Sequence, residues 1–141
     1  MPWGRLQVIM EALPLRIMPG EDLRLALEGA LAAGGSDAAF VISGIGSLCQ
    51  ARLRLAGKAK PDPIEGCLEI LTIAGTIAGN GAHLHMSAAD SEGRVTGGHV
   101  TYGCTVRTTA EVLLVLLPDW SFTRESDPNS GFRELVLRSK R

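Results

Sequence analysis

The three histidines of this chain, His83, His85 and His99, all lie in one short segment. Successive side chains of a β-strand point to opposite faces, so we expect His83 and His85 to share a face, with alpha carbons about 6 to 7 Å apart. Two imidazoles at this spacing can bind one metal ion. The pattern therefore predicts a metal site on a strand.

A hairpin would bring the third histidine to the same site. Residues 89–94 are rich in turn-forming types, which predicts a turn between two strands. If the turn centres on Ser91, His83 lies opposite His99, within cross-strand contact. A register shift of one residue would move His99 to the other face. Gly97 and Gly98 indicate a bulge or a close backbone approach beside it.

Three neutral imidazoles, with at least one position left for water or substrate, are typical of an open zinc site. Nitrogen ligands also suit nickel, copper and ferrous iron. We therefore expect His83, His85 and His99 to bind a divalent metal, with zinc as the first choice. The alternative is that the three are ordinary hydrogen-bonded strand residues.

The length of 141 residues predicts a single domain covering residues 1–141, with residues 1–12 as an N-terminal extension. Fourteen Lys and Arg against fifteen Asp and Glu give a net charge of −1. This balance lacks the basic excess that phosphate-driven nucleic-acid binding requires. Two local basic clusters are expected to be a solvated face and a solvated tail: Arg52, Arg54, Lys58 and Lys60, and Arg138, Lys140 and Arg141.

Cysteine usage favours a reducing compartment. Cys49, Cys67 and Cys104 are odd in number and widely spaced, so neither a disulfide framework nor a thiolate zinc site is expected. The chain does not begin with a signal-peptide pattern. Its longest apolar run, residues 112–117, is too short to cross a bilayer. We therefore expect a cytoplasmic protein without a membrane partner.

The hydrophobic pattern predicts an α+β fold, mostly antiparallel, with about seven strands and one main helix in a single compact domain. The helix follows Glu21 and Asp22 and ends at Gly34-Gly35, with an apolar stripe at helical spacing. The stripe is Leu23, Ala26, Leu27, Ala30 and Leu31.

Strands are expected on both sides of this helix. Pro14 indicates that residues 13–17 lie at a sheet edge or at the start of a strand. The apolar residues 110–117 indicate a central strand or one covered by an oligomer partner. Pro118 ends that strand. Residues 57–63 form a loop, and a turn before the last strand or docking segment lies in residues 127–137. The other predicted strands are 38–45, 51–55, part of 66–77, and the two strands of the histidine hairpin.

Several segments together resemble a known family, the plant and prokaryote conserved (PPC) domain, in its stand-alone prokaryotic type. The resemblance covers nearly the whole chain from Leu13 onward, and the His-x-His and Gly-Gly-His pattern is its most specific part. The matching pieces are Arg16, residues 19–23, 43–48, 66–71, 81–103 and 109–112, and Phe122, Arg124, Gly131, Phe132 and Leu135.

The resemblance implies a homotrimer of α+β protomers, with a divalent metal on the three histidines in some prokaryotic members. It also implies a DNA-binding role. The chain lacks the Arg-Gly-Arg-Pro type core of the AT-hook that accompanies the domain in plants, so DNA is only a weakly supported partner. In residues 66–71, Cys67 and Leu68 replace the Arg and Phe of the plant interaction motif.

Three functions fit these observations. The first is a trimeric metal-binding module with a regulatory or DNA-associated role. The second is a metalloenzyme in which the metal activates water. Asp90 and Glu111 are the nearest carboxylates in the motif, but a turn role suits Asp90 better and a structural role suits Glu111 better. Ser87 has no recognisable partner for nucleophilic chemistry. The third is a purely structural assembly unit. The sequence alone leaves the assignment as an enzyme open.

Overall fold

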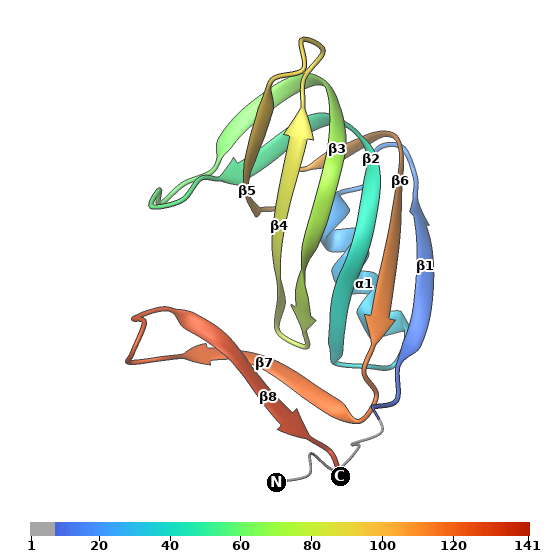
Figure 1. The fold of residues 1–141 in the computed structure, drawn as a ribbon, viewed down its shortest axis with the longest axis vertical. Helices are drawn as coiled ribbons and strands as arrows, with labels where there is room; N and C mark the ends of the chain where they lie inside the picture. Colours follow the sequence, from blue (N-terminus) through green and yellow to red (C-terminus); the bar gives the residue numbers. More distant parts are fainter. Residues whose placement is uncertain (1–7) are drawn as a thin grey trace, which may run out of the picture.

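The computed structural model describes residues 8–141, in which eight strands and one helix are arranged as a six-stranded antiparallel sheet, a helix behind it and a two-stranded hairpin at one end (Figure 1). The helix is α1 (Leu23–Ala33). The strands are β1 (Glu11–Ile17), β2 (Ala38–Arg54), β3 (Asp62–Ala78), β4 (Gly81–Ala89), β5 (Val95–Val100), β6 (Thr105–Leu116), β7 (Trp120–Ser126) and β8 (Arg133–Ser139).

The helix forms where the sequence predicts it. Asp22 is its N-cap, and the Asp22 carboxylate accepts a hydrogen bond from the backbone N–H of Leu25 at 3.0 Å. Gly34 is the C-cap. Leu23, Leu27 and Leu31 are buried against the sheet, so the apolar stripe is the core-facing side of the helix.

The strand order β1-β6-β2-β3-β4-β5 confirms two further expectations. β1, which contains Pro14, is an edge strand. β6 lies between β1 and β2, so it is an interior strand of the sheet. The sheet buries one face under α1, as the alternation of buried Val112, Leu114 and Leu116 along β6 shows.

The prediction of seven strands is wrong in detail, because one pair of predicted strands is a single strand and one strand was missed. Residues 38–45 and 51–55 belong to the continuous β2, whose pairing with β6 shifts at three bulges instead of ending near Gly46. β7 follows Pro118 closely, in a segment to which the sequence pattern assigns no element. The proposed extension, residues 1–12, also includes the first residues of β1, while residues 1–7 lie outside the described range.

The sheet curls so that β2 meets β5 as well as β3. Arg54, at the end of β2, pairs with His99. The close approach requires glycine, because a Cβ at Gly98 would lie 2.9 Å from the carbonyl oxygen of Arg54. The glycine pair in the sequence therefore marks a close backbone contact, as predicted, and it brings Arg54 beside the histidines.

The β7–β8 hairpin is fixed to the sheet at the β3–β4 turn. The Asn80 side chain accepts a hydrogen bond from the backbone N–H of Arg124 at 2.8 Å and donates one to the Arg124 carbonyl at 3.0 Å. Phe122 is buried with Ala38 and Ala78 in a second, small apolar cluster. These contacts determine where the side chain of Arg124 lies.

Gly75 is required where β3 approaches β4. Its φ is +145°, and an added Cβ would collide with the carbonyl oxygen of His83. We expect Gly75→Ala to lower the free energy of unfolding by about 3 kcal/mol or more, from steric strain in the backbone that carries His83. Chemical denaturation measures the change.

Gly29→Ala provides the control for this substitution. Gly29 lies in α1 with open space around the added Cβ, so this change should stabilise the protein by about 0.5 to 1 kcal/mol. Equal stabilities for the two variants would contradict the steric account.

Candidate metal centre

The histidine hairpin forms, but its register differs from the one predicted. His85, not His83, lies opposite His99, so the turn centres on Glu92 instead of Ser91. The Asp90 carboxylate determines this turn, because it accepts hydrogen bonds from the backbone N–H groups of Glu92 and Arg94. The partner of His99 therefore moves by two residues along β4, which leaves all three histidines on one face.

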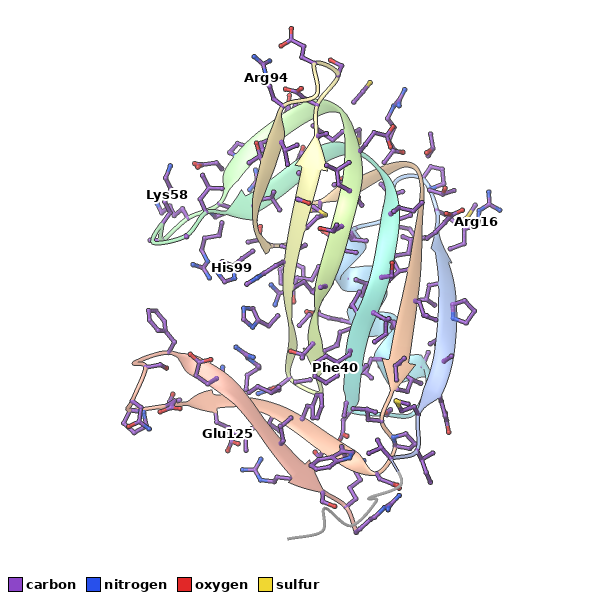
Figure 2. All side chains as sticks on the ribbon, in the orientation of Figure 1. Arg16, Phe40, Lys58, Arg94, His99 and Glu125 are labelled. Atoms are coloured by element: carbon purple, nitrogen blue, oxygen red, sulfur yellow. The ribbon has the colours of Figure 1, made fainter. Side chains whose placement is uncertain are left out.

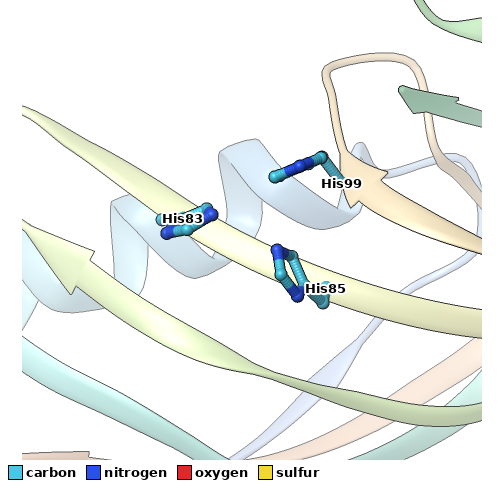
Figure 3. Close-up of side chains that lie close together, drawn as sticks. All are labelled: His83, His85 and His99. Atoms are coloured by element: carbon cyan, nitrogen blue, oxygen red, sulfur yellow. The ribbon is translucent and has the colours of Figure 1, made fainter. Parts of the chain in front are cut away.

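The three imidazoles converge (Figure 3). Ring centroids are 5.0 Å apart for His83 and His85, 4.6 Å for His85 and His99, and 5.3 Å for His83 and His99. One potential ligand atom from each residue lies within 4.8 Å of the other two. Small side-chain rotations would bring these nitrogens to the ~2.1 Å that a bound zinc requires.

Buried residues on the core-facing side of β4 fix the position of the histidines. On β4, the residues that alternate with the histidines, Ala82, Leu84 and Met86, are buried in the main core. The three histidines lie on the other face of the strands, where His83 and His99 are half-buried and His85 is exposed. The three imidazoles thus stand on the sheet, with an open side toward solvent.

Burial and neighbouring cations lower the pKa of two of the imidazoles, which favours their neutral form. Desolvation lowers the pKa of His83, and the positive charge of Arg124 lowers it further, as do His85 and His99, whereas Glu134 acts in the opposite direction. Desolvation and the charge of Arg54 likewise lower the pKa of His99. Neutral imidazole is the form that binds a metal. Both lowered pKa values therefore favour the metal-binding form of the rings at neutral pH.

The lowered pKa values of His83 and His99 predict how metal affinity depends on pH. Both rings are neutral above pH ~6.5 and gain protons as the pH falls through their lowered pKa values. We expect the metal dissociation constant to be nearly constant from pH 8 to 7 and to rise steeply toward pH 5. Titration with a competing chelator at each pH measures it, and an affinity unchanged at pH 5 would contradict the prediction.

A cavity of about 650 Å³ opens beside His83 and His99, between the loop after β2 and the β7–β8 hairpin. Figure 2 shows Lys58 on that loop and His99 on the side facing the hairpin. The charged residues of the lining are mainly cationic: Arg54, Lys58, Arg124 and Arg133 with one carboxylate, Glu134. Sequence reasoning missed Arg124 and Glu134 as site residues and assigned Arg54 and Lys58 to a solvated face.

The other candidates from the sequence have structural roles. Asp90 bonds to its own turn and to the Arg94 side chain at 3.0 Å, and Glu111 is the residue opposite Arg16 in the backbone register of β1 and β6. Ser87 shares a hydrogen bond of 3.0 Å with Thr72. None of these residues lines the cavity, so the expectation of structural roles for Asp90 and Glu111 stands.

Comparison with known proteins identifies relatives. The family model described as the Plants and Prokaryotes Conserved (PCC) domain matches residues 7–118. A bifunctional protein GlmU from Synechococcus sp. (strain JA-2-3B'a(2-13)) is 42% identical over 138 residues, which are 98% of this chain and 21% of that protein. The chain therefore spans about a fifth of the length of the curated relatives it matches.

Solved structures share the fold of this chain, among them the following two. A hypothetical protein from Salmonella cholerae-suis (Salmonella enterica) has a TM-score of 0.91 and 33% identity, covering 95% of this chain and 97% of its own. A metal-containing protein from Archaeoglobus fulgidus has a TM-score of 0.77 and 25% identity, covering 92% of this chain and 95% of its own. The likeness to the Salmonella protein extends past residue 118, where the family model ends.

Proposed function

Because this chain belongs to the Plants and Prokaryotes Conserved (PCC) domain family, as the sequence resemblance predicted, we propose that it is a metal-binding member of that family with a regulatory role. His83, His85 and His99 would bind one divalent ion, zinc first among the candidates. The convergence of the three imidazoles within 4.8 Å on a rigid sheet carries this proposal. When bound, the ion would supply a Lewis-acidic centre with an open position.

Two further observations support the metal. The Archaeoglobus relative, which shares the fold, is a metal-containing protein. The pKa values of His83 and His99 are lowered, which favours the neutral ligand form. Elemental analysis of protein purified without an affinity tag tests the proposal. About one metal per chain supports it, and protein that remains metal-free after incubation with zinc would refute it.

We also propose that the protein assembles as a homotrimer through the outer face of the sheet. Large apolar side chains stand exposed there, on the face opposite α1: Phe40, Ile42, Ile45 and Leu71. Half-buried Leu113 and Val115 of β6 continue the patch. An apolar surface of this kind is typical of a protein interface, and the family resemblance favours three copies.

DNA binding by the chain alone should be weak. The net charge is −1, and much of the basic surface is already paired. In the C-terminal basic cluster, Arg138 pairs with Glu125, Lys140 with Asp37 and Arg141 with Asp119. The C-terminal basic cluster therefore offers few unpaired charges to replace phosphate counterions.

We expect a labelled duplex to bind non-specifically at low salt, with an affinity that fades toward physiological salt. Fluorescence anisotropy across a salt series measures this. Tight, sequence-selective binding at physiological salt would contradict the prediction and would favour a direct DNA-binding role.

Glu134 supports a second candidate function, a metal-dependent hydrolase. It is the one carboxylate among the residues that line the cavity beside His83 and His99, and its side chain is 3.9 Å from the Arg124 guanidinium. A carboxylate near an open metal position can act as a general base for water. Turnover of a trial ester by wild type and its loss in Glu134→Gln would favour this function, whereas no turnover favours the binding module.

A further inference from the structure

We propose that the cavity beside the histidines binds a small organic molecule through an oxyanion group, a phosphate or a carboxylate, which Arg54 and Arg124 contact next to the metal. This inference rests on the proposed metal site and names the class of ligand that the site would take. It follows from the charge, the placement and the pairing of the cavity residues.

The charge of the lining is strongly unbalanced. Four cationic side chains and one carboxylate surround the cavity, and a divalent ion on three neutral imidazoles would add two further positive charges. Lys58 is paired with Asp62 at 3.0 Å, and Arg124 lies 3.9 Å from Glu134. Among residues 8–141, no carboxylate forms an ion pair with Arg54 or Arg133. An anionic ligand would supply the missing charge.

The two arginines flank the histidines from different elements. Arg54 is the cross-strand partner of His99, so their side chains are neighbours. Arg124 reaches the cavity from the hairpin, and its charge acts on His83. Both residues also line a second hollow of about 140 Å³ together with His83 and His99. An oxyanion at the open side of the histidines would therefore lie between two guanidinium groups.

Each of the two guanidinium groups donates a hydrogen bond to a backbone carbonyl and retains further N–H donors. Arg124 donates to the Arg133 carbonyl at 2.8 Å, and Arg54 donates to the Lys58 carbonyl at 3.3 Å. Each uses one of its five N–H donors in the bond to a backbone carbonyl, which leaves others for a ligand. Planar guanidinium groups match phosphate and carboxylate oxygens in pairs.

The volume of the cavity indicates a ligand larger than an inorganic ion. Its volume of about 650 Å³ is in the range of small-molecule sites. Among the lining residues, Phe132 is 74% exposed at the end of the β7–β8 turn, directly before β8, and offers an apolar ring to the body of a ligand. The oxyanion would lie at the histidines and the rest of the molecule would extend toward the hairpin.

Calorimetric titration of zinc-loaded protein with inorganic phosphate and, separately, with acetate tests the inference. We expect at least one probe to bind, and Arg54→Gln to weaken that binding about 10-fold or more while zinc content stays at wild-type level. Arg124→Gln should do the same. Arg94→Gln, a change in an arginine exposed on the distant β4–β5 turn, should leave both affinities unchanged.

The zinc content of every sample separates the two proposals. A wild-type protein that binds no zinc would refute the metal site and this inference with it. A zinc-loaded protein that binds neither probe, or that binds them equally well in Arg54→Gln and Arg124→Gln, would overturn the inference alone. The preferred probe identifies the ligand group as phosphate or carboxylate.

Discussion

His85→Ala is expected to lower the affinity for the metal by at least about 100-fold, because it removes one of three ligands. This loss should exceed the roughly 10- to 100-fold that removal of an outer hydrogen-bond partner of a metal ligand costs. His85 is exposed on the outer face of β4, so the fold should survive the change. Elemental analysis after dialysis, together with circular dichroism, measures both effects.

Ser87→Ala is the matched control. Ser87 is the next residue along the same face of β4 and bonds to Thr72, outside the cluster. Its metal content should equal that of wild type. A triple variant with alanine at positions 83, 85 and 99 that still retains full metal would contradict the assignment of the ligands.

Ile42→Glu is expected to convert the proposed trimer to a monomer at micromolar concentration. The Ile42 side chain is 55% exposed in the single chain and belongs to the apolar outer face, on β2 between β6 and β3. Burying it at an interface contributes about 1.5 to 3 kcal/mol per copy, and a buried unpaired carboxylate would cost more. Light scattering measures the mass.

Leu25→Glu is the control, because it introduces the same carboxylate at an exposed leucine outside the proposed interface. Leu25 is similarly exposed, at 56%, but it lies on the solvent side of α1, away from the outer face of the sheet. This variant should remain a trimer. A wild-type protein that is monomeric at micromolar concentration, or an Ile42→Glu protein that stays trimeric, would contradict the proposed interface.

The sequence predicted the centre of the site because the relevant geometry is local. The period of two residues along a strand places His83 and His85 on one face, and the turn residues return the chain to His99. The exact register was not predictable from turn propensity alone. It depends on which backbone N–H groups the Asp90 carboxylate binds, and it differs from the prediction by two residues along β4.

The wall of the cavity could not be predicted in the same way, because it depends on contacts between distant segments. Arg124 reaches His83 only because Asn80 bonds to its backbone and Phe122 is buried at the end of the sheet. Arg54 reaches His99 because β2 continues through its bulges to pair with β5. Alternation along the sequence predicts the face of a residue but not these long-range contacts.

The most direct test of the central claim is anomalous diffraction from crystals of the zinc-incubated protein at the zinc absorption edge. The account predicts one strong anomalous peak per chain, within about 2.1 Å of one ring nitrogen from each of His83, His85 and His99. A fully loaded crystal with its peak elsewhere, or no peak at this cluster, would contradict it.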